Sequence, residues 1–192
     1  MPMMTRPVVD ERDGLLAFLA AQRSGVTLAT YGLTDEQARL TPTRSTLSLA
    51  GLIKHLTFVE ANWLDLVLQR QRPYEERRAL YAQQFQVGLE ETLAGIIAGY
   101  QEVARRTEDI VAGIADLGQP VPVPAEVPWF PKDVPAWSVR WVLLHLIEET
   151  SRHAGHADLI REHIDGASAP SLVAAAEGWP ESEWIKPWKP PD

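Results

Sequence analysis

The chain has 192 residues, of which 45% are apolar and 23% charged, and a chain of this length is expected to form one domain with a core that needs no covalent staples. Since it contains no cysteine, disulfides, cysteine-ligated metal sites and a cysteine nucleophile are excluded. A formal charge of −8 argues against nucleic-acid binding, which needs a basic surface.

The first predicted element is a helix over residues 10–30, with Asp10 as its N-cap and Leu15, Leu19 and Val26 on its apolar face. Its apolar run, residues 15–21, follows acidic residues, whereas a signal peptide begins with a basic segment. The longest uncharged stretches, residues 24–34 and 166–176, are shorter than the roughly 18 residues that a membrane span requires. We therefore expect a cytoplasmic protein without a membrane partner.

Two further helices are predicted from apolar residues that recur every three or four positions. The first covers residues 48–69 and is expected to end before Pro73. The second covers residues 87–115, includes Leu89 in its apolar pattern, and is expected to end at Gly118 and Pro120. Residues 118–136 contain six of the 15 prolines and predict a long, stiff crossover, a kind of loop that often lines sites.

Ser138 is a candidate N-cap for a fourth helix, which runs to about residue 164 and stops at Asp165 and Gly166. Inside this helix, Gly155 fits the close approach of another helix; the alternative is that the helix merely tolerates it. No strand-like alternation is found, so the predicted fold is all-α: a four-helix bundle over residues 1–166. Residues 167–192 are expected to form an irregular tail that docks on the bundle through Trp179, Trp184 and Trp188.

The fourth helix carries polar residues inside its apolar stripe, which consists of Val142, Leu146, Ala157, Ile160 and Ile164. At about 100° per residue, Glu149 and His153 fall within the same arc and are expected to point inward. Burying a carboxylate and an imidazole is costly unless something compensates them. A divalent metal ion would compensate both, and their i, i+4 spacing suits two ligands of one ion.

A third ligand has to come from another helix, and the second helix offers His55. The alternative is a hydrogen-bonded pair of Glu149 and His153 beside an unrelated surface His55. On the fourth helix, His145 and His156 flank the stripe. Either could replace one of the ligands, line a pocket, or lie at the solvent boundary, while His163 is expected at the surface.

In residues 51–56, GLIKHL, and 138–166, SVRWVLLHLIEETSRHAGHADLIREHIDG, the chain resembles the DinB/YfiT-like superfamily of four-helix metalloproteins. The branch it resembles includes the mycothiol-dependent maleylpyruvate isomerase domain, and helix order extends the likeness over residues 10–166. Many members use three histidines, one on the second helix and an HxxxH pair on the fourth. Since Glu149 replaces the first histidine of that pair, the resemblance implies His55, Glu149 and His153 as the metal ligands.

These observations favour a metal-dependent transferase or isomerase that acts on a small-molecule substrate with a low-molecular-weight thiol such as mycothiol. Zinc is the expected metal, with nickel, iron and manganese as the alternatives for such ligands. Arg140 and Trp141 open the fourth helix and are candidates to bind a substrate or cofactor; otherwise they form a surface ion pair and aromatic packing. The other hypotheses are a metal-dependent hydrolase and a non-catalytic metal-binding stress or interaction protein. A homodimer is expected.

Overall fold

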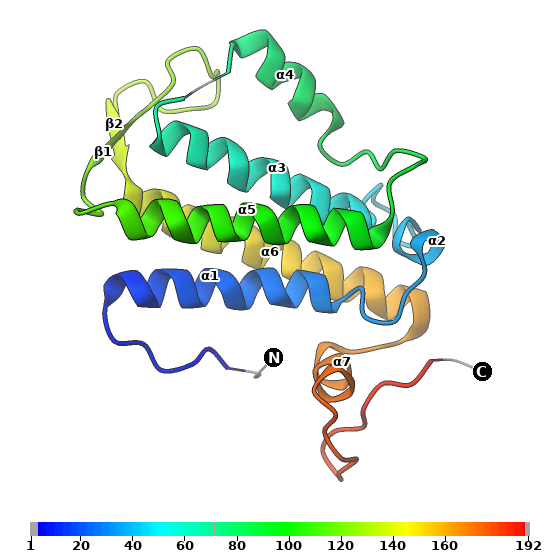
Figure 1. Cartoon of the computed structure of the whole chain (residues 1–192). Helices are drawn as coiled ribbons and strands as arrows, with labels where there is room; N and C mark the ends of the chain where they lie inside the picture. The colour runs from blue at the N-terminus through cyan, green and yellow to red at the C-terminus, as the bar shows by residue number, and fades with distance from the viewer. Residues whose placement is uncertain (1–3, 71, 191–192) are drawn as a thin grey trace.

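The computed structural model describes residues 4–70 and 72–190 (Figure 1). Four long helices form the bundle that the sequence predicts: α1 (Glu11–Leu28), α3 (Leu49–Val67), α5 (Leu93–Gly113) and α6 (Val139–Asp165). Helix α1 packs on α6, and α3 packs on both α5 and α6. The all-α four-helix fold is therefore confirmed.

Polar side chains set where the long helices begin. Asp10, Ser48, Thr92 and Ser138 each accept a hydrogen bond from the backbone N–H three residues later, at 2.8–3.1 Å. Such bonds satisfy donors that have no partner inside the helix. The cap at Thr92 explains why α5 begins later than the predicted residue 87, and Leu89, which precedes it, is 96% exposed.

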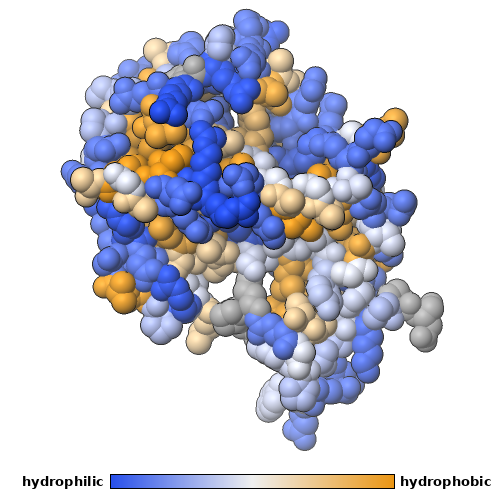
Figure 2. Space-filling view, in the orientation of Figure 1, coloured by the Kyte–Doolittle hydropathy of each residue, from blue (hydrophilic) through white to orange (hydrophobic). Residues whose placement is uncertain are grey.

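Three short helices and a pair of strands were not predicted. Helix α2 (Asp35–Ala38) follows α1, α4 (Tyr74–Gln83) lies between α3 and α5, and α7 (Ala169–Ala176) follows α6. Within the proline-rich crossover, β1 (Pro120–Pro122) pairs antiparallel with β2 (Ala136–Ser138). In Figure 1, α4 lies outside the bundle beyond α3, and Figure 2 shows a mainly hydrophilic surface over it at the top of the view.

The core lies between the long helices in two neighbouring groups of buried side chains. One group surrounds Leu52, Tyr100 and Ile160, and the other surrounds Trp63 and Leu146. Burial of this apolar surface is the main favourable contribution to folding. No helix within the described residues is long and apolar enough to cross a membrane.

Gly155 does not mark a close helix approach, contrary to the expectation. It lies on an exposed part of α6, and a Cβ atom at this position would meet no described atom within 4 Å. The glycine therefore has no packing role among the described residues.

The segment after Gly166 is only partly irregular, because α7 occupies residues 169–176 and Pro170 lies in its first turn, where a missing N–H costs little. Beyond α7, Trp188 docks on the bundle: its Nε1 donates to Asp165 Oδ2 at 3.1 Å, and its ring lies 4.8 Å from the Arg161 guanidinium. Trp184 is 90% exposed, so it is not the anchor that was expected.

Candidate metal centre

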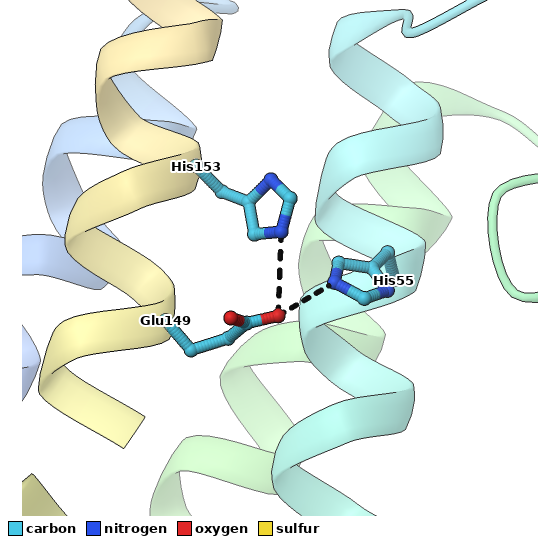
Figure 3. A group of neighbouring side chains, drawn as sticks. All are labelled: His55, Glu149 and His153. Atoms are coloured by element: carbon cyan, nitrogen blue, oxygen red, sulfur yellow. Dashed lines mark hydrogen bonds and ion pairs between the residues drawn. The ribbon is translucent and has the colours of Figure 1, made fainter. Parts of the chain in front are cut away.

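Three polar side chains meet between α3 and α6 (Figure 3). His55 extends from α3, and Glu149 and His153 extend from successive turns of α6. Glu149 Oε1 lies 3.1 Å from His55 Nε2 and 3.3 Å from His153 Nε2. One ligand atom from each residue lies within 4.8 Å of the others, so the three predicted ligands are together in the fold.

The separations between the Glu149 oxygen and the two histidine nitrogens suit the ligands of one metal ion. Zinc bonds of about 2.0–2.1 Å in a tetrahedron place neighbouring ligand atoms about 3.3 Å apart. The two nitrogen–oxygen distances, 3.1 and 3.3 Å, are close to that value. The same distances also suit N–H···O hydrogen bonds. The choice between a metal site and a hydrogen-bonded group therefore depends on where the imidazole protons are.

The second nitrogen of His55 is held by a residue that follows α4. Gln84 is buried, and its Oε1 lies 2.9 Å from His55 Nδ1, while the ring of Phe85 stacks on His55 at 4.2 Å. When the Nδ1–H group donates a hydrogen bond to Gln84 Oε1, the neutral ring presents the lone pair of Nε2 to the Glu149 carboxylate. Two acceptors then face each other, and a cation between them is favourable. With the Gln84 amide reversed, Nε2 would instead donate to Glu149.

His153 has a similar partner on its far side. Its Nδ1 lies 3.3 Å from Nδ1 of His156, one turn further along α6. Burial lowers the pKa of His156, and the charge of nearby His153 lowers it further. A neutral His156 can accept a hydrogen bond from the Nδ1–H group of His153. The lone pair of His153 Nε2 is then free to bind a cation. The structure therefore places His156 next to Nδ1 of His153, whereas Nε2 of His153 lies near Glu149.

Glu149 is poised to remain ionised. When both histidines carry their protons on Nε2, hydrogen bonds from His153 and from His55 hold the pKa of its carboxyl group far below the usual value, against the opposing effect of burial. Its side chain is partly exposed, whereas both histidines are buried. The group therefore combines a carboxylate oxygen with two imidazole nitrogens, a donor set that divalent transition metals accept.

A pocket of about 340 Å³ opens beside this group, between α3 and α4. His55 and Glu149 contribute to its wall, as does His145, one turn before Glu149 on α6. His145 stacks on Trp141 at 5.2 Å, and its Nδ1 lies 3.7 Å from Glu148 Oε2. The remaining lining residues come from α3, α4, its C-cap and the crossover: Phe58, Val59, Asn62, Trp63, Tyr74, Arg77, Arg78, Tyr81, Gln84, Val127, Trp129 and Phe130.

The other predicted site residues lie farther from the pocket. Arg140 forms an ion pair with Glu11 at 2.5 Å, and neither Arg140 nor Trp141 is among the residues that line the pocket. Trp141 instead supports His145 by stacking. His163 is exposed at the surface, as expected. Gln84 was not predicted, because it lies in a polar segment without a motif.

Comparison with known proteins agrees with this architecture. A family model described as mycothiol-S-transferase matches residues 14–166, which run from α1 to the glycine that ends α6. No curated protein matches the chain.

Proposed function

The chain belongs to the mycothiol S-transferase family, and on this basis we propose that it is a metal-dependent S-transferase. The reaction joins a low-molecular-weight thiol such as mycothiol to an electrophilic small molecule. The observation that carries the proposal is the convergence of His55, Glu149 and His153 beside a pocket. Gln84 and His156 lie at the far nitrogens of the two histidines, where they can fix the rings for metal binding.

We propose zinc as the metal, with His55, Glu149 and His153 as its protein ligands. Three ligands are the number that catalytic zinc sites use, since such sites keep a further position for substrate or water. A divalent ion held by these three residues would act as a Lewis acid and would lower the pKa of a thiol in the site, which favours the thiolate near neutral pH.

The residues of the chain would then position the reactants and handle the proton. We assign His145, which lies in the pocket wall one turn before Glu149, as the base that accepts the thiol proton. The sulfur donates its electron pair to an electrophilic carbon and forms a C–S bond. In a substitution, a leaving group departs with the electron pair of its bond to that carbon. In an addition, the adduct takes up a proton instead.

Titration of the cobalt-substituted protein with mycothiol tests this function. We expect a ligand-to-metal charge-transfer band that saturates, and formation of a thioether from an electrophile in the same sample. His153→Ala should lose both signals, and His163→Ala, which changes an exposed histidine on the same helix, should keep them. A protein that hydrolyses esters or amides but shows no thiolate band would favour the hydrolase. A protein that binds metal without either activity would favour the non-catalytic alternative.

The remaining expectations concern assembly and location. We propose a homodimer, to which exposed apolar side chains of α6 such as Leu144 and Leu159, each about half exposed, would add separate contacts. Sedimentation velocity tests the dimer, since a monomeric mass at micromolar concentration would contradict it. We also propose a cytoplasmic location, and a division of the chain into the bundle of residues 1–166 and a docked tail of residues 167–192.

A further inference from the structure

A positive charge in the pocket has no role in the proposed metal centre. Arg77 extends from α4 into the pocket wall, and only 11% of its side chain is exposed. Its Nη2 donates to Glu126 Oε1, but the buried Nε has no hydrogen-bond partner among the described residues. A buried guanidinium N–H without an acceptor is unfavourable, so an anion that reaches Arg77 through a small shift of the pocket wall gains a charge-assisted hydrogen bond. Arg78 also lines the pocket, but its side chain is 70% exposed and pairs with Glu75 at 3.7 Å, so the buried positive charge of the pocket comes from Arg77.

Aromatic side chains form much of the remaining wall. Trp63 lies 5.8 Å from Phe130, with an interplanar angle of 34°, and Tyr81 lies 5.7 Å from Trp129 at 36°. The first pair joins α3 to the crossover, and the second joins α4 to the crossover. Flat rings at such angles favour contact with a flat, apolar ligand, since aromatic groups attract one another in offset and tilted arrangements.

The size and place of the pocket restrict its occupant. A volume of about 340 Å³ is near the lower end of the range for small-molecule sites, which suits a molecule built on one ring. The same pocket is lined by His55 and Glu149, so an occupant lies next to the candidate metal ligands. An occupant of the pocket is therefore positioned to react with the thiol.

We propose that this pocket binds the electrophilic acceptor of the reaction, and that the acceptor is an aromatic molecule with an acidic group. The ring lies among Trp63, Trp129 and Phe130, and the acidic group accepts hydrogen bonds from Arg77. This inference rests on the proposed transferase function and adds the substrate class. A neutral aromatic ligand would contact the same aromatic side chains, but the Arg77 guanidinium would then have no anionic partner besides Glu126.

Binding of a matched pair of probes tests the inference without turnover. The acid 3,5-dinitrobenzoate and its methyl ester share one ring and differ in charge, and neither carries a halide leaving group. Calorimetric titration of the zinc-loaded chain is expected to show at least tenfold tighter binding of the acid. The same titration of the chelated chain should keep this preference, which separates Arg77 from direct coordination of the carboxylate by zinc.

Variants assign the preference to Arg77. Arg77→Gln should remove it and leave ester affinity within about twofold, whereas Arg105→Gln, at an exposed arginine of α5, should leave both affinities unchanged. Equal binding of acid and ester by the wild-type chain, or an acid preference that survives Arg77→Gln, would overturn the inference. Glu126→Gln removes the competing carboxylate and should tighten acid binding several-fold. If Arg77→Gln does not fold, unchanged or weaker acid binding by Glu126→Gln overturns the inference.

Turnover distinguishes this inference from the function on which it rests. With 4-chloro-3,5-dinitrobenzoate, the thiol sulfur bonds to the ring carbon that bears chlorine, chloride leaves with the C–Cl electron pair, and the thiol proton goes to a base. Thioether formation with equal efficiency from this acid and its methyl ester would refute the acceptor class and keep the transferase. Acid binding through Arg77 without thioether from either compound would refute the transferase instead.

Discussion

Gln84 Oε1 lies 2.9 Å from His55 Nδ1, so a residue at the C-terminus of α4 orients a candidate metal ligand on α3. Both side chains are buried, and the contact joins segments 29 residues apart. An acceptor at Nδ1 fixes the imidazole tautomer and makes Nε2 a better ligand. Helix α4 therefore contributes both to the pocket and to the proposed metal centre.

Removal of this acceptor is expected to weaken metal binding. Gln84→Leu keeps the approximate side-chain volume but leaves His55 Nδ1 without a partner, and we expect zinc affinity to fall about 10- to 100-fold. Gln83→Leu changes the neighbouring exposed glutamine and is the matched control. Competition with a chromophoric zinc chelator measures both. Equal affinities in the two variants would show that Gln84 does not support the site.

Glu149→His separates a metal site from a hydrogen-bonded group. The variant has the three-histidine ligand set that the resemblance to the superfamily suggests, so zinc should still bind and should raise the melting temperature. Without zinc, loss of the carboxylate that lies near both imidazoles should destabilise the fold by about 1–3 kcal/mol. Melts with and without zinc measure the difference. A variant that zinc does not rescue, beside a wild-type chain indifferent to zinc, would contradict the metal site.

Gly155→Ala is expected to stabilise the protein. The position is helical and exposed, and an added Cβ would meet no described atom within 4 Å. Because alanine favours a helix by about 1 kcal/mol over glycine, the free energy of unfolding should rise by up to that amount. Urea titration measures it. A loss of stability would indicate a close contact at Gly155 after all.

Gly32→Ala should have the opposite effect. Gly32 has φ +73°, and a Cβ at this position would lie 2.5 Å from the ring of Trp188. The substitution therefore strains the backbone and displaces the tail from the bundle. We expect lower stability in urea and faster proteolysis after Gly178. Unchanged proteolysis with a normal melting temperature would show that Trp188 does not hold the tail.

Most of the bundle could be predicted because its signals are local. Caps such as Asp10 and Ser138 and the spacing of apolar residues give α1, α3 and α6 within about two positions at each end. Helix α4 has no buried apolar residue and therefore no apolar stripe to reveal it. Strands β1 and β2 have three residues each and depend on a pairing across the crossover, which sequence periodicity does not report.

The site was predictable to the same extent. Glu149 and His153 were found because polar residues interrupt an apolar stripe, and the structure brings His55 to them as expected. Gln84 and Arg77 were missed, since each gains its role only when α4 folds back over α3. Contacts that join separate elements leave no local pattern in the sequence.

Zinc stoichiometry in the intact chain tests the central claim most directly. Equilibrium dialysis followed by elemental analysis is expected to find one ion per wild-type chain, and sharply lower affinity in His55→Ala and His153→Ala. His163→Ala should bind like the wild type, because that histidine is exposed on the same helix as His153. Zinc bound by His55→Ala with full stoichiometry and unchanged affinity would contradict the proposed ligand set, and a wild-type chain that binds no zinc would contradict the proposed zinc centre.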